Sequence, residues 1–237
     1  MSTPERLTLS ERMALARHRT VEARTLRGLP PDTLPMPLDD PPARAAPART
    51  LPTLPPTPAW QVRAQPGQHV VLMPGQLHFG AAAASLRTLL GSCVAVTLWH
   101  PERRIGGMCH FLLPARSNRA GEAPDGRYGD DALEAMVQAI KVTGTDPRDY
   151  HAHLYGGADT LPDGVRIKFN VGERNIEKGW SLIDQHGFQL QGVDVGEDVP
   201  RTVTLTLATG EVEMRRGTGK VPVHTSPAGH GTSSRPR

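Results

Sequence analysis

Short apolar runs, each ended by Gly, Pro or another turn residue, predict a series of β-strands from about residue 68 onward. The run 94–99 is apolar at nearly every position, which is typical of a strand that is buried on both faces. His100–Pro101 ends this run in a turn, so the next run is expected to return as its hairpin partner. The expected strands are 68–73, 86–90, 94–99, 105–113, 151–155, 165–171, 190–195, 203–207 and 211–215.

Two segments show the 3.6-residue spacing of amphipathic helices instead. The apolar stripe of the first helix consists of Leu133, Met136, Val137 and Ile140. Asp131 is expected to cap its N-terminus, with Glu134 in the capping-box position three residues later. Gly144 stands where a glycine after the last turn would end the helix.

The second helix is expected to end at Gly187. Its repeating apolar and small positions are Ile176, Gly179, Trp180 and Ile183. Asn170 or Asn175 is the expected N-cap, and the alternative is that the segment 172–175 lines a substrate cleft. Runs of strands with two separate helices indicate an α+β fold in which the helices cover sheet faces.

Proline content and charge divide the chain into three parts. Residues 1–59 hold 12 of the 23 prolines and are expected to be a mostly disordered N-terminal extension. We interpret its proline tracts as an extended spacer, and the alternative is a ligand for a proline-recognition domain. Residues 60–215 are expected to form one folded domain, and residues 216–237 a basic disordered tail.

The net charge of +3 comes from the two ends of the chain, because residues 60–214 alone carry −4. A mildly acidic domain is not expected to bind nucleic acid. No apolar run reaches the roughly 18 residues of a membrane span. The polar start of the chain does not resemble a secretory signal, so we expect a cytoplasmic protein whose two cysteines are free thiols.

The candidate chemistry lies around Cys93, which follows Gly91 and Ser92 at the start of a buried strand. A thiol nucleophile needs a nearby base, an exposed sulfur atom and donors for the developing oxyanion. His110 lies on the returning strand of the same hairpin, and Thr88 could orient its imidazole. Strand alternation puts Met108 and His110 on one face and Cys109 on the other.

The residues alone leave other interpretations open. Cys93 could be an inert core residue, because free cysteine is among the most buried residue types. A zinc site would use Cys93, Cys109 and His110, but these residues lack the ligand spacing typical of such sites. A redox sensor would need a Cys93–Cys109 disulfide, which their opposite faces disfavour. His151 and His153 share a strand face, but two histidines without a third ligand do not predict a metal site, and we expect them to be surface residues.

Four stretches of the sequence, in this order, resemble the CheD family, the chemoreceptor glutamine deamidases of bacterial chemotaxis. They are Thr88-Leu-Leu-Gly-Ser-Cys93-Val-Ala-Val, Gly106-Gly-Met-Cys-His110-Phe-Leu-Leu-Pro114, Tyr155-Gly-Gly-Ala158 and Asn170-Val-Gly-Glu-Arg-Asn-Ile-Glu177. The resemblance covers about residues 68–214 and leaves the two ends of the chain outside it.

The resemblance implies two mixed β-sheets packed as a sandwich, with helices on the outer faces. It implies Cys93 as the nucleophile, His110 as the general base and acid, and Thr88 as the residue that orients His110. Backbone N–H groups around Gly91 and Ser92 are our candidates for the oxyanion site and cleft. The implied reaction is hydrolysis of a receptor glutamine to glutamate through a cysteine thioester, as in a protein-glutamine glutaminase, with no metal and no organic cofactor.

The implied substrate is the cytoplasmic domain of a chemoreceptor, and the implied location is the cytoplasm, at chemoreceptor arrays. A CheC-type phosphatase is a further implied partner, and we expect a monomer without membrane insertion. The alternative function is a non-catalytic adaptor that binds chemoreceptors or such a phosphatase. An adaptor need not keep Thr88, Cys93 and His110 together, so the presence of all three favours the enzyme.

Overall fold

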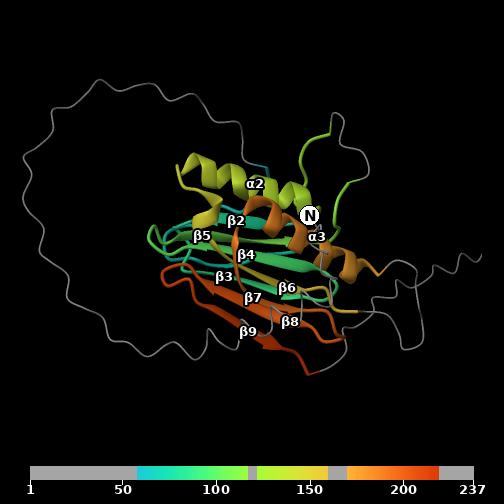
Figure 1. Ribbon diagram of the computed structural model, residues 1–237. Helices are drawn as coiled ribbons and strands as arrows, with labels where there is room; N and C mark the ends of the chain where they lie inside the picture. Colours follow the sequence, from blue (N-terminus) through green and yellow to red (C-terminus); the bar gives the residue numbers. More distant parts are fainter. Residues whose placement is uncertain (1–57, 117–121, 160–169, 219–237) are drawn as a thin grey trace, which may run out of the picture.

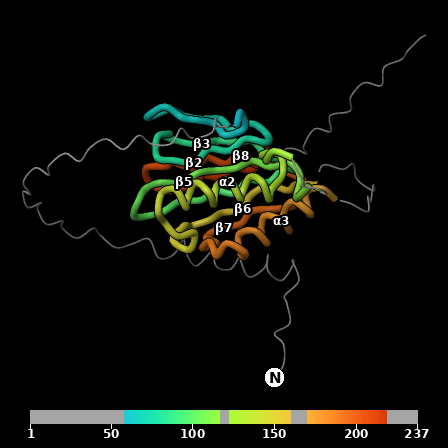
Figure 2. The backbone as a smooth tube through the Cα atoms, turned by 90° about the horizontal axis from the view of Figure 1, so that it is seen from above, coloured from blue at the N-terminus to red at the C-terminus, as the bar shows by residue number. Residues whose placement is uncertain are grey.

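The computed structural model describes residues 58–116, 122–159 and 170–218, and the predictions for residues 1–57 and 219–237 lie outside these ranges. Two β-sheets pack face to face, and two helices lie side by side on the outer face of one of them (Figure 1). The view from above shows both helices lying over the strands of the five-stranded sheet and running in roughly the same direction as these strands (Figure 2). Within the described ranges, no helix is both long enough and apolar enough to cross a membrane.

The four-stranded sheet has the order β1-β3-β8-β9, and the five-stranded sheet has the order β2-β5-β4-β6-β7. Each sheet is mixed, because β1 runs parallel to β3 and β6 runs parallel to β7, whereas the other neighbours are antiparallel. The expected α+β sandwich is therefore confirmed. The strands are β1 His69–Val71, β2 Leu77–Gly80, β3 Ser85–Leu90, β4 Val94–His100, β5 Ile105–Phe111, β6 His151–Gly156, β7 Gln189–Val195, β8 Arg201–Thr206 and β9 Val212–Arg216.

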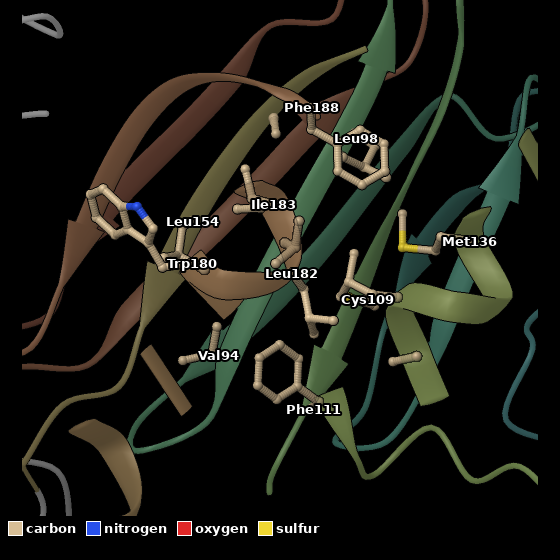
Figure 3. Close-up of a cluster of buried hydrophobic side chains, with 14 of the residues drawn as sticks. Val94, Leu98, Cys109, Phe111, Met136, Leu154, Trp180, Leu182, Ile183 and Phe188 are labelled. Carbon is tan, nitrogen blue, oxygen red and sulfur yellow. The ribbon is translucent and has the colours of Figure 1, made fainter. Parts of the chain in front are cut away.

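The central strand β4 supplies side chains to two separate apolar clusters. Val94, Val96 and Leu98 point toward the helices, where Phe111 and Cys109 of β5 join them (Figure 3). Ala95 points the other way, into the cluster between the two sheets. Both faces of β4 are thus removed from water, which explains why its sequence is apolar at almost every position.

The two helices, α2 Gly129–Val142 and α3 Val171–His186, bury the apolar stripes that the sequence predicts. Gly144 and Gly187 follow their last turns with φ of 72° and 74°, a left-handed conformation that glycine adopts without steric cost. Asn170 caps α3, because its side chain accepts a hydrogen bond from the Glu173 N–H at 3.3 Å. A short 3₁₀ turn, Pro147–Asp149, precedes β6.

The strands of the structure differ from the predicted strands at two places. Strand β2 was not expected, since four residues beside a turn are too short for a periodic signal and their pairing with β5 comes from the tertiary structure. The strand predicted at 165–171 falls mostly outside the described residues, and its last residue, Val171, is the first residue of α3.

The predicted capping role of Asp131 is wrong. The N-cap of α2 is Tyr128, whose side chain makes no capping hydrogen bond. Asp131 lies inside the first turn, where it is buried and accepts a hydrogen bond from the Asp125 N–H at 2.9 Å. Its carboxylate also pairs with Arg116 at 3.2 Å, and the Arg116 side chain is only 9% exposed. The acidic residue therefore anchors the loop before α2 instead of capping the helix.

We predict that Asp131→Ala lowers the free energy of unfolding by about 2 kcal/mol, because it leaves the guanidinium of Arg116 buried with one carboxylate fewer. Glu134→Ala on the exposed side of the same helix is the control, and a change within about 0.5 kcal/mol is expected there. Urea unfolding of both variants measures the difference. Equal losses in the two variants would contradict the anchoring role.

Candidate active site

The chain passes from one sheet to the other in three residues, Gly91, Ser92 and Cys93. Strand β3 of the four-stranded sheet ends at Leu90, and β4 of the five-stranded sheet begins at Val94. Cys93 therefore lies at the end of the sandwich and not within a strand, as the glycine and serine before it predict. Its side chain is partly exposed.

All three carbonyl groups of this connection accept hydrogen bonds from later parts of the chain. The Ala158 N–H donates to the Gly91 oxygen at 2.9 Å, and the Gly157 N–H donates to the Cys93 oxygen at 2.8 Å. The side-chain amide of Asn175, from α3, donates to the Ser92 oxygen at 3.2 Å. The backbone around the thiol is thus held from both the end of β6 and the helix layer.

Gly156 and Gly157 make this close approach possible. Their φ values of 108° and 66° lie in the left-handed region. A Cβ atom on Gly156 would collide with the Cys93 carbonyl oxygen, and one on Gly157 would collide with the side chain of Ile176. The sequence predicts only a turn here, whereas the structure packs this turn against the backbone of Gly91 and Cys93.

Cys93 and His110 lie on the same face of the β4–β5 hairpin. Ala95 pairs with His110 across the two strands, and the side chains of Ala95, Met108 and Cys93 all belong to the cluster between the sheets. Cys109 lies in the cluster on the helix side, as strand alternation predicts. The two cysteines are therefore separated by the sheet itself.

Thr88 joins His110 from the opposite sheet. The Thr88 hydroxyl donates to the Leu72 carbonyl oxygen at 2.8 Å, and its oxygen lies 2.7 Å from His110 Nδ1. A hydroxyl has one proton, and a carbonyl can only accept, so the Thr88 oxygen must accept the proton of Nδ1. The lone pair of the neutral imidazole is therefore on Nε2, which is buried and has no hydrogen-bond partner among the described residues.

Burial keeps both reacting groups uncharged. It lowers the pKa of His110 from 6.5 to about 4, and a hydrogen bond to the Leu72 backbone opposes this only in part. It raises the pKa of the Cys93 thiol above 9.0, although the N–H of Cys93 itself acts in the opposite direction. The neutral thiol of Cys93 and the neutral imidazole of His110 are therefore the favoured forms on this face of the hairpin.

Asn175 is the site residue that sequence analysis missed. It was considered as a helix cap, but Asn170 has that role, and Asn175 is completely buried on the face of α3 that packs against the sheet. Its position in the sequence could have indicated this burial. Asn175 lies three residues after Gly172 and next to Ile176, on the buried face of the helix. A polar residue on such a face needs a specific hydrogen-bond partner.

The histidines outside this site have structural contacts. His153 points into the sandwich, where its Nδ1 lies 3.2 Å from Thr97 Oγ1 and its ring stacks on Tyr155. It is not the surface residue that we expected. In the described part of the chain, no group of three or more His, Cys, Asp or Glu side chains is arranged so that it could hold a metal ion.

Comparison with known proteins finds one family and a set of close relatives. A family model described as "CheD chemotactic sensory transduction" matches residues 112–216, which begin just after His110. The "Probable chemoreceptor glutamine deamidase CheD" of Pseudomonas syringae pv. tomato is 43% identical over 148 residues, which are 62% of this chain and 88% of that protein. The protein of the same name from Pseudomonas fluorescens is 44% identical and covered to 83%, and "CheD 1" of Chromobacterium violaceum is 41% identical and covered to 78%.

The reactivity of the two thiols should follow their burial. We expect iodoacetamide to modify Cys93 more slowly at pH 7 than it modifies free cysteine, with a rate that still rises beyond pH 9. Burial raises the pKa of Cys109 to about 12, so this residue should react only after unfolding and serves as the internal control. Intact-mass spectrometry measures both rates. A Cys93 rate that is already constant at pH 7 would indicate a preformed thiolate instead.

Stability should fall as the solution is acidified from pH 6.5 to pH 4. Desolvation lowers the pKa of both His110 and His153 from 6.5 to about 4, so in this window the unfolded chain binds protons there that the folded chain does not. Each residue should contribute a loss of roughly 3 kcal/mol. Urea unfolding at several pH values measures the slope. His153→Gln should make it shallower, and an unchanged slope would refute this account.

Proposed function

The chain belongs to the CheD family, and from this premise we propose that it hydrolyses glutamine side chains of chemoreceptors to glutamate and ammonia. The observation that carries the proposal is the hydrogen bond from His110 Nδ1 to Thr88, because it leaves the basic Nε2 free on the face that Cys93 shares. The glutamine deamidase names of the relatives support the same chemistry.

In the first half of the proposed reaction, Cys93 Sγ attacks the side-chain carbonyl carbon of the glutamine. The thiol proton passes to His110 Nε2, so the neutral pair becomes reactive only as the new C–S bond forms. The tetrahedral intermediate has a negative oxygen, for which the backbone N–H groups of the segment Gly91–Cys93 are our candidate donors. His110 then returns the proton to the leaving nitrogen, and ammonia departs to leave a γ-glutamyl thioester on Cys93.

In the second half, water enters the place of the ammonia. His110 Nε2 accepts one proton of the water while its oxygen attacks the thioester carbon. Collapse of this intermediate breaks the C–S bond, and the proton on His110 returns to the sulfur atom of Cys93. The products are a glutamate side chain and the original thiol. Every step uses only groups of the chain and one water molecule, so the chemistry itself requires no metal or organic cofactor.

We further propose that the protein acts in the cytoplasm at chemoreceptor arrays, as a monomer, with a CheC-type phosphatase as a partner. The family resemblance supports these points. The basic, Pro-rich ends of the chain remain outside the proposed reaction.

Substitutions in the three reacting positions should separate their roles. We expect Cys93→Ala to abolish ammonia release from a purified chemoreceptor cytoplasmic fragment, and His110→Ala to reduce it by roughly 10³-fold. Thr88→Val should reduce it by roughly 100-fold, because the imidazole loses the acceptor that fixes its tautomer. Ammonia release, together with mass spectrometry of the glutamine-to-glutamate change, measures all three variants.

The control is circular dichroism, which should show that each variant keeps the fold of the wild type. A His110→Ala enzyme with a near-normal rate would remove the base assignment. Binding of the receptor fragment without ammonia release by the wild type would favour the adaptor function over the enzyme.

A further inference from the structure

Asn175 connects helix α3 to the two backbone segments that carry the nucleophile and the base. Its Nδ2 donates to the Leu112 carbonyl oxygen at 2.7 Å and to the Ser92 carbonyl oxygen at 3.2 Å. Both partners can only accept, so the nitrogen of the amide group must face them. We propose that Asn175 is a positioning residue for Cys93, a role that rests on the proposed deamidase function.

The two acceptors lie at the open end of the β4–β5 hairpin. Ser92 directly precedes Cys93, and Leu112 comes two residues after His110. The hairpin pairs Val94 with Phe111, so beyond this pair the two strands leave the ladder. A single amide group therefore holds the segment of the nucleophile and the segment of the base at a constant separation.

The hydrogen bond to Ser92 also fixes the direction of the next N–H group. A trans peptide is planar, so its C=O and N–H point in opposite directions, and the described residues contain no cis peptide. Because the Ser92 oxygen faces Asn175 in the helix layer, the Cys93 N–H points away from that layer, toward the side on which the thiol lies. This N–H and the thiol belong to the same residue, so the two groups lie close together, and the N–H acts to lower the thiol pKa. It is therefore placed to donate to an oxyanion that forms on a carbon bonded to Sγ.

Asparagine at position 175 lowers the stability of the fold relative to an apolar residue. Its Oδ1 is buried and has no hydrogen-bond partner among the described residues, which is unfavourable for stability. Asparagine is also a weak helix former in the interior of a helix. Its neighbours on the buried face of α3 are glycine and isoleucine, so an apolar residue would suit the packing. The two hydrogen bonds donated by Nδ2 are therefore the reason we give for an asparagine at this position.

Glycines bring the helix close enough for so short a side chain. Gly172 and Gly179 lie three residues before and four residues after Asn175, on the same face of α3. A Cβ on Gly172 would lie 2.6 Å from the Gly157 carbonyl oxygen, and one on Gly179 would lie 2.7 Å from Leu154 Cδ1. The helix backbone therefore packs directly on the sheet, and Asn175 reaches backbone carbonyls that a more distant helix could not.

The test compares two asparagines of the same helix. Asn175→Ala should lower kcat for ammonia release by about 100-fold and leave KM within about two-fold, because substrate binding is unaffected while the oxyanion donor is misplaced. Asn170→Ala removes the helix cap and lowers the melting temperature, yet kcat should stay within about two-fold of the wild type. Asn175→Asp keeps the shape of the side chain without the amide donors, and it serves if the alanine variant does not fold.

A folded Asn175→Ala or Asn175→Asp enzyme with wild-type kcat would overturn the proposal. An equal loss of kcat in Asn170→Ala would also overturn it, because the effect would then follow helix stability.

The alkylation rate of Cys93 by iodoacetamide provides a readout that does not depend on the reaction. We expect it to change at least five-fold in Asn175→Ala and to be unchanged in Asn170→Ala. If the wild type releases no ammonia, the deamidase proposal fails, and this rate still decides the positioning role: a wild-type rate in both Asn175 variants would reject it.

Discussion

The hydrogen bond between His110 and Thr88 is the interaction on which the site depends, because it decides which nitrogen of the imidazole can act as a base. Thr88 already donates its only proton to the Leu72 carbonyl, so it can only accept from His110 Nδ1. The two residues belong to different sheets. The packing of one sheet on the other is therefore also what sets the tautomer of the proposed base.

The chain supports this arrangement by changing sheets directly before the nucleophile. Three residues between β3 and β4 carry it from the sheet of Thr88 to the sheet of His110. Such a short connection would be mobile if its carbonyl groups bonded only to water. Here all three carbonyls have donors, two from the turn after β6 and one from α3. Rigid elements on two sides thus hold a segment that has no regular structure of its own.

Burial gives the site a particular electrostatic character. An ion pair of thiolate and imidazolium would have to be desolvated between the sheets, and both pKa shifts show that the neutral forms are favoured there. In the proposed reaction, the proton moves only when a carbonyl group is present to receive the electron pair of the sulfur. Under this proposal, the arrangement limits the reaction of the thiol with other electrophiles, and Nε2 of His110, which has no hydrogen-bond partner among the described residues, serves the reaction despite its cost in stability.

The sequence by itself determined the features that depend on local periodicity. Alternation along β5 was sufficient to place Met108 and His110 on one face and Cys109 on the other, because successive side chains of a strand point to opposite sides. The apolar run of β4, the hairpin and both glycine helix ends follow from equally local rules. Strand β2 and the anchoring role of Asp131 could not be predicted, since each depends on a partner that is distant in the sequence.

Only the tertiary structure decided the contacts that complete the site. Thr88 and His110 are 22 residues apart and meet because two sheets stack, and Asn175 reaches Ser92 across 83 residues because glycines let α3 lie directly on the sheet. Sequence motifs could suggest Thr88 as a partner, but they could not show which atom donates. The physical reason is that a hydrogen bond depends on distances of a few tenths of an ångström, and only the packing of whole elements sets such distances.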